Sequence, residues 1–432
     1  MKFRKLLIAS AAAGALALSA CASGDANGGS SSPATDAAGT LTVWLQTDAQ
    51  QGWPELVDAA SAAVKKQYPN VTVNVEYQTW PDHLTKLDAA LAGSTPPDVV
   101  ELGNTEMTKY MAAGALADLT SQKGNFDNSA TWLNALTESA TFDGALYGVP
   151  YYAGSRAVIY NTALYTKAGI ASAPATYDEF ISDNDKLMAA NASDKNFSAY
   201  YFPGKNWYGA MPWVYDQGGA IAVQDGGQWK GSLDSAEAQK GLEALKQVVL
   251  KYSKADKTGD ESKQDQAFAQ GSIAAIYGNG WERGVIIDPK TGNPDLKDSL
   301  GAYPLPSLAK PGTTMPAFLG GSDLAVTSKS ANQAWAAAWI KAFTSTESMT
   351  AMVKKGVLPN TTSLLDLVAP ADQPFAKSAA NSWFVPTSPN WANVEKANVL
   401  PNMLVDIFTE KKTVAQATAD ASAEITKILN GS

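Results

Sequence analysis

Cysteine and histidine, which supply much of the nucleophilic, redox and metal chemistry of proteins, each occur once in this chain of 432 residues. Cys21 has no second thiol with which to form an intrachain disulfide, a zinc site or a redox pair. A single histidine excludes multi-histidine metal sites and leaves at most one candidate for a Ser-His-Asp arrangement. Because His83 lies in Trp80-Pro81-Asp82-His83-Leu84, we expect it to be solvated at a helix start. The sequence therefore predicts no metal site and no cofactor.

Carboxylates and aromatic rings are the remaining candidates for chemistry. The 42 Asp and Glu residues leave hydrolysis by a carboxylate pair open. The 12 tryptophans and 16 tyrosines are more distinctive, because a sugar ring can lay its C–H face on an aromatic ring while its hydroxyls bond polar groups. Any single tryptophan has the alternative of a place in the core. The formal net charge of −9 argues against a nucleic-acid partner, since that binding depends on neutralising phosphates.

The first 21 residues have the pattern of a secretory leader. A basic start, with Lys2, Arg4 and Lys5, precedes an apolar run over 6–20 that is shorter than the ~20 residues of a spanning helix. Leu18-Ser-Ala-Cys21 resembles a bacterial lipobox, and the resemblance implies cleavage before Cys21 and lipid on its sulfur. We therefore expect 1–20 to be a signal peptide and 21–39 a lipidated cysteine with a flexible spacer. The alternative is ordinary cleavage beside an incidental cysteine.

Alternating strand and helix patterns begin the folded part. Strand-like runs at 41–45, 71–77 and 98–102 are separated by helical patterns that follow Pro54 and cover roughly 81–92. This order predicts a largely parallel sheet, whose ligands sit beyond the carboxyl ends of the strands. The loops at 46–48 and 103–106 lie there. Further helices are expected at 162–168, 177–190, 235–252 and 331–343, and after Thr413.

Three segments look like crossings between two lobes: Tyr147-Gly-Val-Pro150, Tyr303-Pro-Leu-Pro306 and Gly356-Val-Leu-Pro359. The length of the chain also favours two domains. We predict an α/β fold with one lobe at 40–150 plus 303–358 and the other at 151–302 plus 359–432, with a cleft and a hinge between them.

Several motifs occur together and in order over residues 40–430. They are Thr42-Val-Trp44, Pro97-Asp-Val-Val100, Tyr147-Gly-Val-Pro150, Ile159-Tyr-Asn161, Lys167-Ala-Gly169, Pro174-Ala-Thr-Tyr177, Gly278-Asn-Gly-Trp281, Phe318-Leu-Gly-Gly-Ser322 and Pro389-Asn-Trp391. With them the chain resembles the carbohydrate-binding family of extracellular solute-binding proteins of bacterial ABC importers. The resemblance implies a two-lobed periplasmic-binding-protein-like fold and a monomer that catalyses nothing. It also implies capture of an oligosaccharide in the cleft, delivery to the membrane permease, and a place on the outer face of the cell membrane.

By position, the resemblance also implies a set of ligand-binding residues: Thr47, Asp48, Asn104, Thr105, Tyr151, Gly154, Arg156, Trp207, Trp281, Glu282, Gly320, Gly321, Ser322, Trp383 and Trp391. Trp207 and Trp281 would stack on sugar rings, while the carboxylates, Asn104 and Arg156 would bond hydroxyls. The glycine pair would let backbone amides approach the ligand. Tyr151 has the alternative of hinge packing, Arg156 of pairing with a structural carboxylate, and Trp383 and Trp391 of the lobe core.

A narrower likeness concerns four segments: Val99-Val-Glu-Leu-Gly-Asn-Thr105, Gly154-Ser-Arg156-Ala-Val-Ile-Tyr-Asn161, Pro203-Gly-Lys-Asn-Trp-Tyr208 and Gly280-Trp-Glu282. They are similar to actinobacterial N,N′-diacetylchitobiose-binding lipoproteins, which makes a chitobiose-like sugar the first expectation for the ligand. Two other classes stay open. A secreted glycoside hydrolase would need two carboxylates at a fixed separation. A cell-wall-binding lipoprotein would be expected to show repeats, and none is visible.

Overall fold

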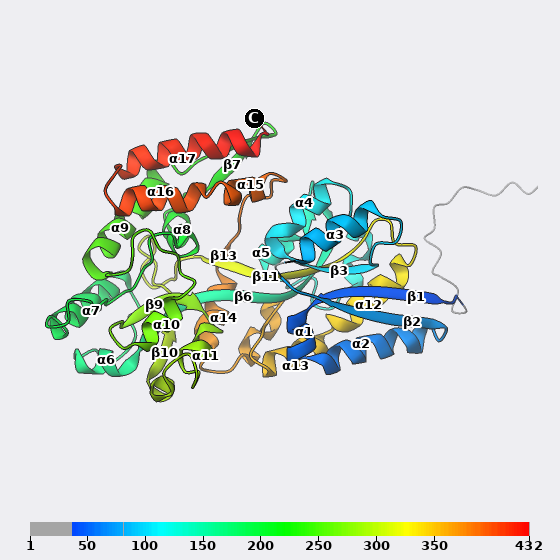
Figure 1. Cartoon of the computed structure of the whole chain (residues 1–432), viewed down its shortest axis with the longest axis horizontal. Coiled ribbons are helices and arrows are strands. Elements are labelled where there is room, and N and C mark those ends of the chain that lie inside the picture. The colour runs from blue at the N-terminus through cyan, green and yellow to red at the C-terminus, as the bar shows by residue number, and fades with distance from the viewer. Residues whose placement is uncertain (1–36, 81, 432) are drawn as a thin grey trace, which may run out of the picture. The chain divides into compact units, whose positions relative to one another are not determined.

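The structure, a computed structural model, describes residues 37–80 and 82–431 (Figure 1). The predicted leader, Cys21 and most of the predicted spacer lie outside these residues. The main sheet has the strand order β10-β6-β11-β3-β1-β2, and three short strands pair at its margins. Its strands are β1 (Gly39–Gln46), β2 (Val71–Gln78), β3 (Val99–Gly103), β6 (Gly148–Asn161), β9 (Ala275–Asn279), β10 (Leu300–Tyr303), β11 (Ala317–Val326), β12 (Leu358–Pro359) and β13 (Ser382–Trp383).

The predicted parallel sheet forms over the first hundred residues. Strand β1 pairs in parallel with β2 and β3, and buries Leu41, Val43 and Leu45 completely. The connecting helices are α2 (Pro54–Gln67), which begins with a proline in its first turn, and α3 (His83–Ala92). These strands pack with α2, α12 (Gln333–Phe343) and α13 (Thr346–Lys354) in what we call the first core. A smaller cluster with α3 and α4 (Met107–Ala112) covers the other face of β3.

A separate set of buried residues, which we call the second core, joins β9, β10 and the far halves of β6 and β11 to several helices. These helices are α6 (Thr162–Lys167), α7 (Tyr177–Ala190), α8 (Trp207–Asp216), α9 (Ala236–Tyr252), α16 (Val399–Phe408) and α17 (Val414–Leu429). Helix α17 begins with the expected Thr413 cap, whose hydroxyl accepts from the Gln416 amide, and buries a stripe from Val414 to Leu429. The bounds of α7 are those predicted from the sequence.

Strands β6 and β11 belong to both cores and lie antiparallel between them (Figure 1). In β6, Val149 and Tyr151 lie in the first core, whereas Ala157 and Ile159 lie in the second. The chain passes from the first core to the second between Tyr151 and Ala153, just after the predicted Tyr147-Gly-Val-Pro150. Another change of core lies within Gly356-Val-Leu-Pro359, where Val357 packs against the first core and Leu358 lies in the second.

The second crossing lies further along the chain than Tyr303-Pro306. Tyr303, Leu305 and Phe318 still pack in the second core, and the chain reaches the first core only at Leu324 within β11. The physical reason is that β10 is held by antiparallel pairing with β6 inside the second core. Residues 303–319 therefore pack with the second core, whereas the sequence-based prediction assigned them to the first lobe.

The remaining elements are short: α1 (Thr47–Gly52), η1 (Asn104–Glu106), η2 (Thr120–Asn125), α5 (Asn134–Ser139), β4 (Thr141–Phe142), β5 (Ala145–Leu146), β7 (Ala222–Asp225), β8 (Gln228–Gly231), α10 (Gln264–Ala269), α11 (Glu282–Ile286), η3 (Pro294–Ser299), η4 (Thr362–Leu367), α14 (Gln373–Ala380) and α15 (Trp391–Lys396). Among the described helices, none has the length and apolar character needed to cross a membrane.

Candidate ligand-binding site

A cavity of about 1010 Å³ is lined by residues from both sides of the β6–β11 pair. One wall comes from α1, η1 and Trp80, which follow the carboxyl ends of β1, β3 and β2 respectively. The other comes from the turn between β9 and α11, together with α14 and α8. The cavity is at the upper end of the range for small-molecule sites, so it has room for more than one sugar-sized unit. Its position beyond strand ends is the one that the βαβαβ order predicts.

The structure brings eight of the predicted site residues to this cavity: Asp48, Asn104, Thr105, Gly154, Arg156, Trp281, Gly320 and Gly321. It places the other seven outside the cavity lining: Thr47, Tyr151, Trp207, Glu282, Ser322, Trp383 and Trp391. Trp383 is buried in the second core, so it has the core position that was the alternative to a place in the binding site.

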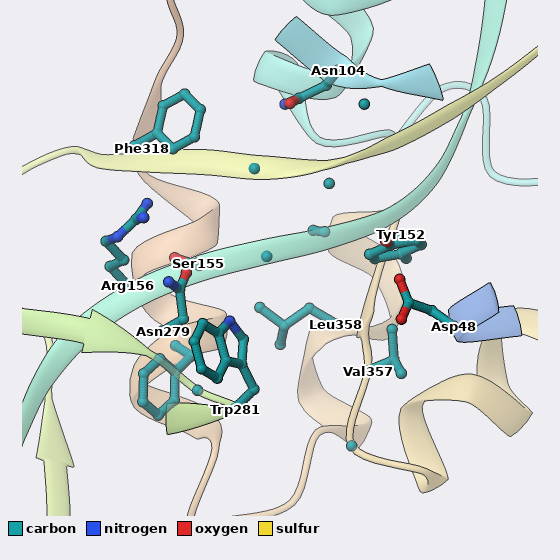
Figure 2. Close-up of a pocket in the computed structure, with 18 of the residues that line it drawn as sticks. Asp48, Asn104, Tyr152, Ser155, Arg156, Asn279, Trp281, Phe318, Val357 and Leu358 are labelled. Atoms are coloured by element: carbon teal, nitrogen blue, oxygen red, sulfur yellow. The ribbon is translucent and has the colours of Figure 1, made fainter. Parts of the chain in front are cut away.

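Trp281 is the most exposed large hydrophobic side chain of the described residues, at 66%. It stands just before α11 and lies beside Asn279 in the cavity (Figure 2). The turn that carries it is held on both sides. A Cβ at Gly280 would lie 3.6 Å from the Phe375 ring, and Arg283 donates to Asp372 Oδ1 at 2.6 Å. Trp281 lines the cavity together with Phe318 and Phe375, and an exposed apolar surface inside a groove is typical of a ligand contact.

The opposite wall carries a second indole, Trp80, which is 36% exposed. Its Nε1 donates to Asp48 Oδ2 at 2.7 Å, and both residues line the cavity. Behind it lies His83, which is only 4% exposed, so the expectation of a solvated histidine is wrong. His83 is buried because Trp80 and Glu106 fold over it, with the Trp80 ring packed edge-on at 5.1 Å.

Arg156 lies on β6 and points into the cavity, close to Phe318 in Figure 2. Its guanidinium lies 4.4 Å from the centre of the Tyr208 ring and 5.8 Å from that of Phe318. Within 37–80 and 82–431, no carboxylate lies within ion-pair distance of it. The alternative of a structural ion pair is therefore not what the structure has. Arg156 is held by stacking, and its donors remain available to a ligand.

Backbone geometry brings β11 close to β6 at the cavity floor. Gly321 has φ +139°, and a Cβ there would meet the Tyr152 carbonyl oxygen at 2.1 Å, so only glycine fits. Gly320 has no such contact under 3.6 Å. Asn104, at the end of β3, donates to the Leu319 carbonyl at 2.8 Å and so ties the first wall to β11.

Two predicted residues have internal partners instead. Glu282 accepts from the Asn279 amide at 2.7 Å and from Gln264 Nε2 at 2.8 Å. Burial, partly offset by these hydrogen bonds, raises the pKa of Glu282 to about 7. Tyr151 is buried in the first core, where its hydroxyl accepts from Trp53. Its neighbour Tyr152 lines the cavity, because successive strand residues point to opposite faces.

A smaller recess of about 200 Å³ lies beside the cavity, with Tyr208 lining both. It is lined by Trp207, Trp391, Glu395 and Asn398 among others. Trp391 donates from Nε1 to Glu395 Oε1 at 3.0 Å and is nearly buried. Two of the predicted tryptophans therefore meet here and not in the main cavity.

Sequence reasoning missed several cavity residues: Gln51, Trp53, Trp80, Tyr152, Tyr208, Asn279, Phe318 and Asp372. Trp80 carried a usable signal, because it follows the strand predicted at 71–77 and so belongs to the same sheet edge as Asp48 and Asn104. Asp372 carried no such signal, because its hydrogen-bond partner Arg283 lies 89 positions earlier in the chain.

Residues 44–350 match the family of bacterial extracellular solute-binding proteins. The chain belongs to this family. It is 32% identical over 436 residues to the diacetylchitobiose binding protein DasA of Streptomyces coelicolor, a match that covers 99% of each chain. Among solved structures it resembles the sugar-binding protein MalE of Xanthomonas citri, with TM-score 0.78 and 19% identity over 90% of this chain and 97% of that one. It also resembles the cyclic α-maltosyl-1,6-maltose binding protein of Arthrobacter globiformis, with TM-score 0.76 and 19% identity over 92% and 100%.

Family membership confirms two of the predictions. The resemblance to extracellular solute-binding proteins holds over most of the chain, and the two-lobed α/β fold is that of the solved relatives. The cavity described above lies between the two cores of this member of the bacterial extracellular solute-binding proteins.

Proposed function

We propose that this solute-binding protein is the component of an ABC importer that captures a short oligosaccharide and presents it to the membrane permease. The exposed Trp281 indole in a cavity of about 1010 Å³ carries the proposal. Trp281 and Trp80 offer apolar faces on opposite walls, while Arg156, Asn279 and Asp48 supply polar edges between them. This pairing of rings with planar polar groups suits a sugar, whose ring faces are apolar and whose rim is hydroxylated.

A disaccharide or short oligomer of N-acetylglucosamine is the ligand we propose first. The support is the full-length likeness to the Streptomyces coelicolor protein, whose name assigns it diacetylchitobiose. Arg156 and Asn279 suit the proposal because their N–H groups can donate to an acetamido carbonyl. The recess at Trp207 and Trp391, which shares Tyr208 with the cavity, would take a further unit of a longer chain.

A sugar panel tests this proposal. Intrinsic tryptophan fluorescence and calorimetry are followed while N,N′-diacetylchitobiose, maltose, xylobiose and a fructo-oligosaccharide are added. We expect saturable binding of diacetylchitobiose with a change in the emission of Trp281. Binding of another sugar alone would reject the N-acetylglucosamine assignment but keep the importer function. Binding of none would contradict both.

The protein is proposed to be non-enzymatic. A glycosidase needs a carboxylic acid with a raised pKa beside its substrate. Burial raises the pKa of Glu101, Glu282 and Asp323 to about 7, but none of the three lines the cavity. New reducing ends after prolonged incubation with the panel would favour the hydrolase alternative.

The lipid anchor at Cys21, removal of residues 1–20 and a monomeric state are part of the same proposal. Here the support is the leader sequence and the extracellular setting of the family. In cells, Cys21→Ser should release the protein from the membrane fraction or stop its processing. Full retention of this variant in membranes would place the anchor elsewhere. The proposed lobes follow the cores, with 303–319 assigned to the second.

A further inference from the structure

Both ring nitrogens of His83 face hydrogen-bond acceptors. Nδ1 lies 2.6 Å from the backbone carbonyl oxygen of Trp80, and Nε2 lies 2.9 Å from Oε2 of Glu106. A neutral imidazole has one donor and one acceptor nitrogen, so one of these two contacts would then bring two lone pairs together. Only the imidazolium ion can donate to both.

The charges around His83 are mostly negative. Glu106 of η1 is in direct contact, Glu101 of β3 and Asp48 of α1 lie on neighbouring elements, and Asp82 precedes it in the chain. Lys109, the nearby cation of α4, is paired with Asp88. The amino end of α3 opposes a positive charge here. Burial lowers the pKa of His83, but Glu106, the Trp80 carbonyl and Glu101 outweigh it, so the pKa is raised above its usual value.

The two acceptors belong to the binding wall. Trp80 and Glu106 both line the cavity directly. Glu106 Oε2 also accepts from the Gly103 amide at 2.8 Å, next to Asn104. Trp80 in turn donates to Asp48. The wall is therefore a connected set of contacts with the His83 ring at its centre.

We infer that His83 is a positioning residue of the binding site, and that its imidazolium ion holds Trp80 and Glu106 in the orientation that the ligand meets. The sugar-affinity part of this inference rests on the function proposed above. The ionisation part does not, because it concerns the unliganded protein. Since the charged form makes both contacts, the wall is fully ordered below the ordinary histidine pKa of ~6.5 and loosens as the pH rises through the raised value.

One histidine in the whole chain makes the ionisation directly measurable. The full chain is prepared without a polyhistidine tag and with ¹⁵N-labelled histidine, and its ring nitrogens are followed by NMR from pH 5 to 10. We expect both nitrogens to be protonated at pH 6, with a midpoint above ~6.5. A neutral ring at pH 6 would overturn the inference. In Glu106→Gln, which removes the facing charge but keeps the side-chain length, the midpoint should fall.

Binding of N,N′-diacetylchitobiose tests the positioning role. His83→Phe keeps a ring beside Trp80 but removes both donors, and we expect about tenfold weaker binding at pH 6, the loss typical of one charge-assisted hydrogen bond. The ratio of wild-type to variant affinity should shrink as the pH rises to 9 but stay above one, because the neutral ring keeps one donor that phenylalanine lacks. Glu282 titrates near pH 7 in both proteins, so its contribution cancels from this ratio. Glu101 interacts with His83, and loss of the imidazolium charge in the variant raises the pKa of Glu101 further. A ratio that is constant with pH would reject a role for the charge.

Two further measurements guard against ambiguity. His83→Gln keeps a donor at every pH. Its sugar affinity should therefore lie between those of the wild type and His83→Phe, and it should show no change with pH that arises from residue 83. If neither protein binds the sugar, the ligand assignment fails, and the indole N–H signal of Trp80 in the free protein decides the inference. That signal should shift with the His83 midpoint because Trp80 packs on the ring at 5.1 Å. An indole signal that is insensitive to this ionisation would refute it.

Discussion

Removal of the Trp281 ring is the most direct test of the site. A tryptophan side chain offers up to about 250 Å² of surface, and 66% of Trp281 is exposed in the free protein. A sugar that covers one face of the indole would remove roughly half of that exposed area, about 80 Å², from water. At about 25 cal/mol per Å², this corresponds to ~2 kcal/mol, or about 30-fold in affinity. We therefore expect Trp281→Ala to bind about 30-fold more weakly.

Calorimetry with the sugar that binds best measures this loss, and thermal unfolding of the same samples measures the fold. The unfolding temperature should hardly change, because the ring buries little in the free protein. Trp281→Phe should lose only about half as much binding free energy as Trp281→Ala, because the phenyl ring still offers an apolar face, although a smaller one. Leu367→Ala is the matched control, because Leu367 is 54% exposed and does not line the cavity. Unchanged affinity in Trp281→Ala, or equal losses in both variants, would refute the stacking argument.

Four other expectations follow from the same site and its surroundings. Arg156→Lys should lower sugar affinity about tenfold in calorimetry, because an ammonium group cannot stack on Tyr208 as the planar guanidinium does; an unchanged affinity would remove Arg156 from the site. Gly321→Ala should lower the free energy of unfolding by about 3 kcal/mol, while Gly320→Ala, which meets nothing closer than 3.6 Å, should be mild; similar denaturation midpoints would contradict this. The pKa of Asp323 is raised to about 7 by burial, so stability from its neutral form is present below pH 4 and lost as the pH rises to about 7. Asp323→Asn should therefore gain on the wild type between pH 4 and 8, by on the order of 4 kcal/mol in denaturant titrations, and a constant difference would count against it. Finally, ligand should lower the radius of gyration in solution scattering if the two lobes close, as in periplasmic binding proteins, and an identical profile at saturation would exclude closure.

Local patterns predicted the elements well where each is stabilised by its own sequence. The alternating strand at 71–77 and the Thr413-capped helix lie where expected, because burial of one face and a satisfied helix start are both local properties. The second crossing was placed too early, at Tyr303-Pro306. Proline and tyrosine there look like an interlobe connection, but the pairing of β10 with β6, almost 150 residues earlier, holds this segment in the second core.

The site was harder to predict than the fold for a related reason. Asp48 and Asn104 could be placed because strand ends converge at one edge of a sheet. Which of Tyr151 and Tyr152 faces the cavity depends on the register of β6 against β11, which a single sequence does not contain. The solvated-histidine prediction failed because Glu106, which covers His83, is 23 positions away in the chain.

The passage of β6 and β11 through both cores also governs how the chain can fold. Strand β3 pairs with β11 across more than 200 positions, and Asn104 reaches the Leu319 carbonyl across 215. The first core therefore cannot be completed by an amino-terminal piece of the protein that ends before β11. Folding is slow when such long loops must close before the strand pairs that stabilise them can form. We expect nascent chains that end before β11 to lack a protease-resistant first core, and chains that extend past α13 at Lys354 to acquire one.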